Sequence, residues 1–419
     1  MKRRFAFSTT PAPDTVLACD RADLLARYRQ RFELPPGTIY LDGNSLGALS
    51  TDARERLHRV ACVEWGESLI ESWNAHDWIS APERVGAKVA RLIGARADEV
   101  VVCDSTSVNL FKLVRAALDL RPERSVVLSE PGNFATDLYV IEGAIAGDAS
   151  RTLRLEPRER VLDAIDGHTA LVVLTHVHYK SAAMHDLRAI TDRAHEHGAL
   201  VLWDLSHSAG AVELDLDAAA ADMAVGCGYK YLNGGPGAPA FLYLNRAHHD
   251  TALSPLRGWM GHARPFAFVD HYEPAPGMRR FLCGTPSALG LAPLEASVEL
   301  LIEAGMANLA AKSRRLTQLF IDLIAASSTL AGLRLVSPAD AAQRGSHVSY
   351  SHPDGYAIMR TLIEHGVIGD FRAPDILRFG FAPLYNRFED VWIAVKTLEQ
   401  VVSGDDWKRP ELLQRRAVT

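Results

Sequence analysis

Three groups of polar residues follow predicted strands of this chain and could carry chemistry. Ser105, Thr106 and Ser107 come after the apolar run VVVC and open a helical pattern. Asp204 ends the run ALVLWD, and Lys230 follows the next run, DMAVG, among several glycines. Ligands of open α/β sheets bind outside the carboxyl ends of the strands. We therefore expect the three groups to face one site.

Each group has an ordinary interpretation as well as a functional one. Hydroxyls and free N–H groups at a helix start suit phosphate, but serine and threonine also cap helices without a ligand. A carboxylate at the end of a buried strand is costly without a partner, but Asp204 could cap the following turn. Enclosure would lower the pKa of Lys230 and make its amine nucleophilic, but most lysines are solvated.

Taken together, the three groups match the needs of pyridoxal phosphate. An enclosed lysine binds this cofactor covalently, a carboxylate keeps its pyridine nitrogen protonated, and a helix start holds its phosphate. His176 and His178, in THVHY, share one strand face, but no third ligand has convincing spacing, so they predict no metal site. The sequence therefore favours a pyridoxal-phosphate enzyme.

The elements that must position these residues alternate along the middle of the chain. Buried strands are predicted for the apolar runs EVVVC (99–103), SVVLSE (125–130), ALVVLTHV (170–177), ALVLWD (199–204), DMAVG (222–226) and PAFLYL (239–244). Helical patterns separate several of them, such as LRAITDRAHEH, which ends at Gly198. This alternation predicts an α/β fold with a large, doubly wound, mostly parallel sheet.

After residue 295 helices and strands group instead of alternating. The helical pattern RRLTQLFIDLIAA precedes the short strand patterns LRLVS, HVSYS and ILRFGF, and a closing helix follows them. This grouping indicates a smaller α+β domain. We expect an N-terminal arm at 1–50 that packs on the small domain, a large cofactor-binding domain at 51–295, and the small C-terminal domain at 296–419.

Composition excludes several classes of protein. The 419 residues carry a net charge of −6, which argues against nucleic-acid binding. The five cysteines form no CxxC pair, which predicts free thiols in a reducing cytoplasm. No apolar run approaches the ~20 residues that a membrane span needs. We expect a cytoplasmic enzyme with a small-molecule substrate.

Six motifs resemble those of the kynureninase family, in the same order along nearly the whole chain. They are YLDGNSLG (40–47), CDSTSVNLFK (103–112), NFATDLY (133–139), WDLSHSAG (203–210), GCGYKYLNGGPG (226–237) and RFGFAPLYNRFED (378–390). The resemblance implies fold type I of the aspartate aminotransferase superfamily. It also implies hydrolysis of L-kynurenine to anthranilate and L-alanine in tryptophan degradation. Kynurenine is favoured over 3-hydroxykynurenine as the substrate.

Other function classes stay open at this point. A class V aminotransferase or a cysteine desulfurase would share the fold, but a desulfurase needs a reactive cysteine in its small domain. No cysteine follows Cys283, which disfavours that alternative. A non-catalytic scaffold is disfavoured because Lys230 and Asp204 are both present.

The resemblance implies a role for each matching residue. Lys230 would bind the cofactor covalently, Asp204 and Asp137 would lie at its pyridine nitrogen, and Phe134 would stack on its ring. Tyr229 would reach the phosphate and act as the acid–base group at the γ-carbonyl of the substrate. Further cofactor contacts would come from Thr106, Ser107, Thr175, His207, Trp259 and Thr285. The family usually has proline after the stacking phenylalanine, where this chain has Ala135.

A second set of residues is predicted to bind the substrate. Arg378 lies in the apolar strand ILRFGF, and its guanidinium would bind the α-carboxylate in a bidentate manner. The alternative is a structural ion pair with an Asp or Glu. Asn44, Ser45 and His76 are the other candidates, and His76 belongs to an aromatic cluster that either borders the substrate or packs in the core.

The resemblance also implies a homodimer with shared active sites. The segments 257–262 and 283–290 fall where chains of this superfamily cross between subunits. They contain Trp259 and Thr285, whose N–H and O–H groups are good donors to a phosphate oxygen. The alternative is that Trp259 packs in the core of its own subunit.

Overall fold

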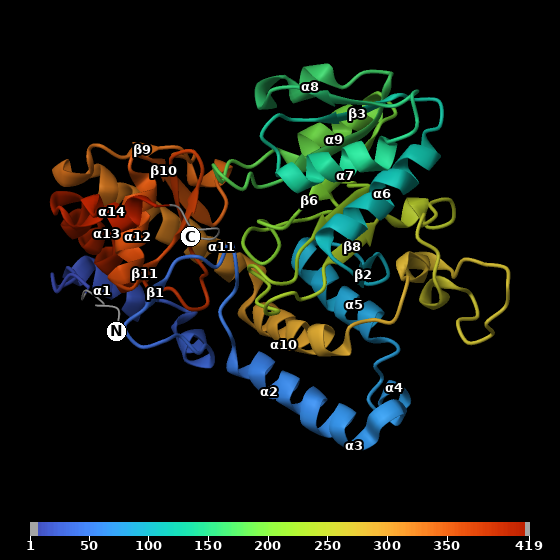
Figure 1. Cartoon of the computed structure of the whole chain (residues 1–419), viewed down its shortest axis with the longest axis horizontal. Helices are drawn as coiled ribbons and strands as arrows, with labels where there is room; N and C mark the ends of the chain where they lie inside the picture. The colour runs from blue at the N-terminus through green and yellow to red at the C-terminus, as the bar shows by residue number, and fades with distance from the viewer. Residues whose placement is uncertain (1–6, 415–419) are drawn as a thin grey trace.

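The computed structural model describes residues 7–414, which form two lobes (Figure 1). The larger lobe is built on a seven-stranded sheet with the order β2-β8-β7-β6-β5-β3-β4. Its strands are β2 (Val100–Val102), β3 (Val126–Ser129), β4 (Thr152–Leu155), β5 (Thr169–Thr175), β6 (Leu200–Asp204), β7 (Met223–Gly226) and β8 (Phe241–Leu244). Neighbouring strands from β4 to β7 are parallel, whereas β8 is antiparallel to both β2 and β7. The predicted α/β fold with a mostly parallel sheet is confirmed.

Helices cover both faces of this sheet, which explains the continuously apolar strands. Val172 and Leu174 of β5 belong to the core that includes α5 (Ala81–Ile93), whereas Leu171 and Val173 belong to the core that includes α6 (Thr106–Leu120). The other helices of this lobe are α2 (Thr51–Arg59), α3 (Gly66–Ser68), α4 (Ser72–Ala75), α7 (Ala135–Ile145), α8 (Val161–Ala164), α9 (Leu187–Glu196) and α10 (Ala288–Ala304). Among the described residues, no helix has the length and apolarity of a membrane span.

The smaller lobe contains a four-stranded antiparallel sheet with the order β12-β13-β10-β9. Its elements are β9 (Arg334–Leu335), β10 (His347–Ser351), β11 (Val367–Ile368), β12 (Asp370–Arg372), β13 (Ile376–Gly380), α11 (Met306–Ala325), α12 (Gly355–Glu364), α13 (Phe388–Ser403) and α14 (Pro410–Leu413). The N-terminal segment lies against this lobe, because β1 (Ile39–Tyr40) pairs with β11 and α1 (Asp14–Arg21) contacts α13.

The parallel register brings the polar strand ends together. Thr175, the last residue of β5, is the direct partner of Asp204, the last residue of β6. Asp204 in turn pairs with Val225 of β7, and Lys230 lies near the start of the loop that follows β7. Because parallel strands end at the same edge of a sheet, the loops that follow them converge there. This edge carries the candidate site.

The opposite edge of the sheet contains a buried carboxylate between two histidines. Asp222 accepts hydrogen bonds from Nε2 of His195 and Nε2 of His248, each at 2.9 Å, and from the backbone N–H of Val201 at 2.8 Å. The hydrogen bond to Asp222 raises the pKa of His195. Burial opposes ionisation of Asp222, but the two histidines hold the pKa of its carboxyl below the usual value. The pair of His195 and Asp222 is therefore most stabilising when the imidazole is charged and the carboxylate is ionised.

We expect His195→Gln to lower the melting temperature more at about pH 5.5 than at about pH 8.5, by roughly 1–2 °C. A raised folded-state pKa stabilises the protein below the unfolded-state pKa, and this stabilisation is lost as the pH rises through the folded-state value. Thermal unfolding at the two pH values measures the difference, with the exposed His168→Gln as control. An equal loss at both pH values would contradict a charged His195.

Candidate active site

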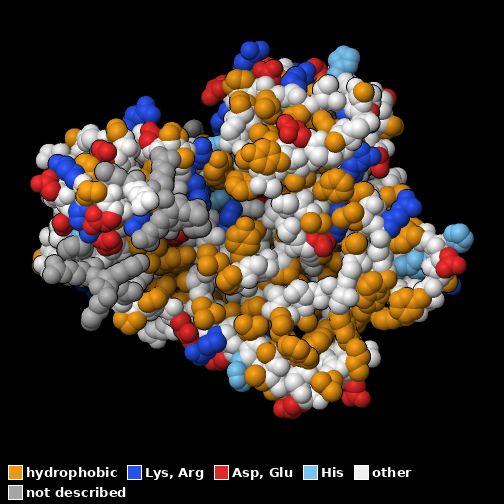
Figure 2. Space-filling model, in the orientation of Figure 1, with side chains coloured by type: hydrophobic (Ala, Val, Ile, Leu, Met, Phe, Trp, Pro, Cys, Tyr) orange, Lys and Arg blue, Asp and Glu red, His pale blue; other side chains and the backbone are white. Residues whose placement is uncertain are grey.

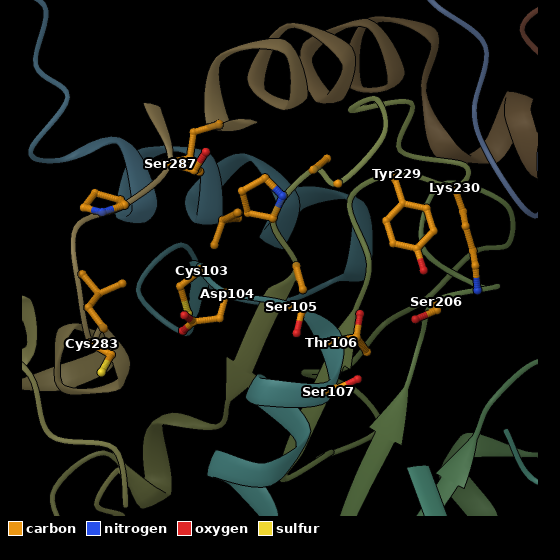
Figure 3. Close-up of a pocket in the computed structure, with 18 of the residues that line it drawn as sticks. Cys103, Asp104, Ser105, Thr106, Ser107, Ser206, Tyr229, Lys230, Cys283 and Ser287 are labelled. Atoms are coloured by element: carbon orange, nitrogen blue, oxygen red, sulfur yellow. The ribbon is translucent and has the colours of Figure 1, made fainter. Parts of the chain in front are cut away.

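The converging loops enclose a cavity of about 650 Å³ at the carboxyl edge of the large sheet (Figure 3). Its walls come from the ends of β2 and β6, the starts of α6 and α7, the loop around Lys230 and the segment before α10. The predicted residues in its lining are Thr106, Ser107, Phe134, Asp137, Asp204, Tyr229, Lys230 and Thr285. Residues from five separate parts of the chain thus share one cavity.

One end of the cavity is formed by the start of α6. Ser105 caps this helix, since its Oγ accepts a hydrogen bond from the N–H of Val108. Figure 3 shows Ser105, Thr106 and Ser107 in succession at the first turn. The hydroxyls of Thr106 and Ser107 and the free N–H groups of that turn favour an anion, as does the helix dipole. The first turn of α6 therefore has a helix cap and also the donors that a phosphate would need.

The middle of the cavity contains two buried carboxylates, Asp137 and Asp204. Oδ1 of Asp204 accepts a 2.8 Å hydrogen bond from the N–H of Ser206, and the hydroxyl of Thr175 lies 3.5 Å from Oδ2 of Asp137. Burial raises the pKa of Asp137 well above its usual range, and the adjacent Asp204 adds to the effect. A cation placed between the two side chains would therefore favour the ionised form of Asp137.

Asn133 also supports this pair and was not predicted from the sequence. Its buried side chain accepts a hydrogen bond from the hydroxyl of Thr175 and donates one to Oγ of Ser129 at 3.1 Å. Asn133 stands in the NFATDLY motif, but no periodicity or composition signal marks it, because its role depends on pairing across β3 and β5.

Lys230 lines the same cavity as the two carboxylates, and Figure 3 shows its side chain beside that of Tyr229. Nζ lies 3.0 Å from Nε2 of His207, and 5.9 Å and 6.0 Å from the ring centroids of Phe134 and Tyr229. Burial holds the pKa of His207 well below its usual value, and the positive charge of Lys230 lowers it further. A neutral His207 can accept a hydrogen bond from the amine. Burial raises the pKa of Tyr229, so its phenol stays protonated.

Ala135 is the first residue of α7, and Phe134 immediately precedes this helix. Proline is favoured at the first helical position, and alanine is also a good helix former there. The replacement of the usual proline by Ala135 therefore leaves the turn that carries Phe134 intact.

Arg378 belongs to a second polar group between the lobes. Its Nε donates to Oδ1 of Asp370 at 2.8 Å, and its terminal nitrogens donate to Oγ of Ser45 at 2.9 Å and to the carbonyl of Tyr179 at 2.6 Å. Asn44 faces the same guanidinium, with 2.9 Å from Nε to its amide oxygen when that oxygen is turned toward the arginine. The structural ion pair foreseen as the alternative for Arg378 is therefore present.

This second group adjoins the cavity without forming part of its lining. Among the described residues, the lining excludes Arg378, Asn44 and Ser45. The group is connected to the cavity through Tyr179, whose ring lies 5.3 Å from that of Phe134 in an edge-to-face arrangement. A substrate on the Phe134 side of the cavity would therefore extend toward the guanidinium.

The structure does not bring two predicted residues to the cavity. Nε2 of His76 lies 3.0 Å from Oγ of Ser68 and faces a separate hollow beside α2 and α10. The ring of Trp259 lies 5.5 Å from that of Phe266 and is absent from the lining made by the described residues of this chain. Thr175 and His207 do not line the cavity themselves, but each contacts a residue that does. Thr175 contacts Asp137, and His207 contacts Lys230.

The residues of the cavity fit pyridoxal phosphate. Asp137 and Asp204 lack a cation between them, and a protonated pyridine nitrogen would provide one. The open first turn of α6 offers donors to a phosphate and lines the same cavity as Lys230. The ring of Phe134, whose centroid lies 5.9 Å from Nζ of Lys230, can stack on the cofactor ring. Each chemical group of the cofactor thus has a complementary group in the cavity.

Comparison with known proteins gives one consistent family. The family model described as the kynureninase C-terminal domain matches residues 309–398. Kynureninase from Pseudomonas fluorescens is 49% identical over 409 residues, covering 96% of this chain and 98% of the relative. Kynureninase from Burkholderia mallei (strain SAVP1) is 48% identical over 413 residues, covering 97% and 99%.

Solved structures are similar in fold at low sequence identity. The cysteine desulfurase CsdA from Escherichia coli superposes with a TM-score of 0.77 at 20% identity, covering 90% of this chain and 98% of that one. A C-DES variant with glycine covalently linked to its pyridoxal-phosphate cofactor gives a TM-score of 0.76 at 18% identity, covering 88% and 98%. These neighbours have the fold type I architecture.

Proposed function

The chain belongs to the kynureninase family and is a pyridoxal-phosphate-dependent hydrolase of carbon–carbon bonds, and we propose that L-kynurenine is cleaved in the 650 Å³ cavity. The observation that carries the proposal is the common orientation of Lys230, the carboxylate pair and the start of α6 toward this cavity. The products are anthranilate and L-alanine. Incubation of the cofactor-loaded protein with L-kynurenine should release fluorescent anthranilate, and a sample that releases none would contradict the proposal.

Bound pyridoxal phosphate withdraws electrons from the substrate into its protonated ring and thereby makes bonds near the α-carbon labile. In our proposal, Asp204 holds the proton on the pyridine nitrogen, with Asp137 and Thr175 beside it. Thr106 and Ser107 bind the phosphate, and Phe134 stacks on the ring. These groups hold the reactive atoms in one orientation, which lowers the barrier by removing motion before the reaction.

Lys230 is the group that moves a proton at the α-carbon of the substrate. Nζ of Lys230 would hold the cofactor, and neutral His207, 3.0 Å away, can orient this amine for the proton transfer. The half-buried phenol of Tyr229 is protonated and can donate to the oxygen at the γ-carbon as water adds there. We assign Lys230 and Tyr229 these two separate proton transfers.

Arg378→Lys should raise the KM for L-kynurenine by about 10–100-fold with a smaller change in kcat. Asp370 occupies one edge of the guanidinium, and we propose that another edge binds the α-carboxylate together with Asn44 and Ser45. Lysine keeps the charge but loses the fork of donors. Steady-state kinetics gives the two constants, and the visible spectrum of the bound cofactor should stay normal.

The control is Arg360→Lys, which changes another buried arginine of the smaller lobe, on α12. This variant should leave the KM unchanged. If Arg378 serves only as the ion-pair partner of Asp370, Arg378→Lys will lower the melting temperature without raising the KM.

We further propose that the protein acts as a homodimer with shared active sites. Thr285 is an exposed residue of the cavity, and Trp259 lies in the neighbouring segment beside Phe266. Phe266 and Phe268 are 64% and 75% exposed, and Ile70 is 77% exposed. Figure 2 shows hydrophobic side chains gathered at the lower right of the molecule, over α4 and α10. Clustered apolar side chains of this kind are typical of an interface.

A mixture of inactive chains should regain activity if the sites are shared. One parent carries Lys230→Ala, and the other carries Trp259→Ala and Thr285→Ala. In a hybrid dimer one site contains both sets of substitutions and the other site contains none. About half of the dimers in an equal mixture are hybrids, so about a quarter of all sites should be active. Mass spectrometry verifies subunit exchange. Exchange without recovery would locate Trp259 and Thr285 in the same site as Lys230.

The remaining proposals concern the setting of the reaction. We propose a cytoplasmic enzyme of tryptophan degradation, in the kynurenine pathway that also supplies NAD biosynthesis, with kynurenine preferred over 3-hydroxykynurenine. The division into an arm at 1–50, a large domain at 51–295 and a small domain at 296–419 is supported by the two lobes. Comparison of the specificity constants for the two substrates tests the preference.

A further inference from the structure

A fully buried lysine lies beneath the first turns of α6. The side chain of Lys112 is 0% exposed, although lysine is among the residue types least often buried. Its Nζ donates to the carboxylate of Asp104 and to the carbonyl oxygen of Phe281 at 2.6 Å, and lies 3.8 Å from Sγ of Cys103. Burial disfavours its charge, but Cys103 and Asp104 keep the pKa of Lys112 above the usual value. Lys112 is therefore a buried cation with several partners.

These partners belong to two separate walls of the cavity. Cys103 and Asp104 immediately precede the phosphate end, in the succession that Figure 3 shows from Cys103 to Ser107. Phe281 ends a short 3-10 helix and immediately precedes the segment 282–287, which lines the opposite wall. Lys112 thus connects the turn before α6 to the segment that carries Thr285.

The turn before α6 needs such a connection. Asp104 has a backbone φ of +48°, in the left-handed region that residues other than glycine seldom adopt. Its hydrogen bond to Lys112 stabilises this conformation, which directs the following hydroxyls into the cavity. An apolar side chain at position 112 would fill the same volume without the cost of burying a charge. Packing alone therefore does not account for the lysine.

We propose that Lys112 is a positioning residue for the phosphate group of the cofactor. It holds the turn 103–107 against Phe281, and this fixes the position of the first turn of α6 and of the phosphate donors that the turn carries. The inference rests on the proposed function, because it takes the start of α6 as the phosphate site. It adds a residue that touches neither cofactor nor substrate.

The test compares pyridoxal phosphate with pyridoxal, which has the same ring and aldehyde but no phosphate. Absorbance titration of the cofactor-free native protein gives a Kd for each compound, and pyridoxal phosphate should bind much more tightly. In Lys112→Met the preference for pyridoxal phosphate over pyridoxal, given by the ratio of the two Kd values, should fall by about tenfold. The reason is that hydrogen bonds to the charged phosphate are lost or misaligned. The Kd for pyridoxal should stay within twofold of native.

Lys312→Met provides a matched control in the smaller lobe. Lys312 is also buried and lies 2.6 Å from Oδ2 of Asp23, so the change is chemically the same. Both Kd values should be unchanged in this variant. If Lys112→Met weakens both compounds equally, or neither, Lys112 has only a structural role and the inference is wrong.

Two other results of the titrations would have different meanings. If the native protein binds both compounds equally well, the start of α6 is not the phosphate site, and the proposed function fails at that point. If Lys112→Met does not fold, Asp104→Asn takes its place, because asparagine tolerates the left-handed conformation and removes only the charge that Lys112 pairs with. An unchanged ratio in Asp104→Asn would then overturn the inference.

Discussion

Replacing Lys230 by alanine should abolish the hydrolysis of L-kynurenine, with kcat reduced at least about 10⁴-fold. The variant loses both the amine that binds the cofactor covalently and the group that moves the proton at the α-carbon. The nearest ring nitrogen, Nε2 of His207, cannot substitute for it. Burial keeps the pKa of His207 well below its usual value, so this histidine accepts a proton poorly.

The state of the cofactor separates this effect from unfolding. Reduction with borohydride followed by peptide mass spectrometry should attach the cofactor to Lys230 in the native protein and leave it unattached in Lys230→Ala. The visible absorbance of the variant should still report bound cofactor. Lys408→Ala, at an exposed lysine of the C-terminal segment, is the control. A variant that retains about 1% of native turnover would contradict the assigned role.

The large sheet could be predicted because its strands are buried on both faces. Continuously apolar runs such as those of β5 and β6 have no other common explanation when helical patterns separate them. The strand β4 was missed because its residues TLRL are partly exposed and lie at the sheet edge. β11 and β12 have two and three residues, too few for any period to appear.

The site could be predicted only where its residues follow strands in sequence. Asp204 ends one apolar run and Lys230 follows another within four residues, so the rule for strand ends applies to both. Asp370 was missed because its contact with Arg378 depends on the register between β12 and β13, which the sequence does not specify. Lys112 had a usable signal, since it lies on the buried face of α6 with Asn109 and Leu113. A lysine on an otherwise apolar helix face can be recognised from the sequence alone.

The similarity to known proteins and the contacts within the site support different conclusions. The relatives at 48–49% identity establish the reaction, whereas the low-identity structural neighbours establish only the fold. The contacts around Lys230, Asp204 and Arg378 are what turn that reaction into residue-level expectations. The carboxylate pair gives the most discriminating of these expectations, because its two members are adjacent but differ in role.

Asp204→Asn should lower kcat about 10²–10³-fold, because amide oxygen cannot hold the proton on the pyridine nitrogen as a carboxylate does. Asp204→Ala should lose at least as much, whereas Asp204→Glu keeps the charge and should retain far more activity. Asp137→Asn alone should cost less than about tenfold, since Asp137 is the member whose pKa is raised by burial and by Asp204. Of the two carboxyls, Asp137 is therefore the one whose protonated form burial favours.

The double variant tests whether Asp137 takes over when Asp204 is neutral. Removing the charge of Asp204 lowers the pKa of Asp137, so in Asp204→Asn this second carboxyl ionises and partly replaces the first. Asp204→Asn combined with Asp137→Asn should then lose roughly tenfold more kcat than the product of the single losses. Cofactor occupancy, measured by absorbance, must be equal in all four proteins. If the two effects multiply without excess, the carboxylates act independently, and the proton-sharing pair inferred from their burial does not exist.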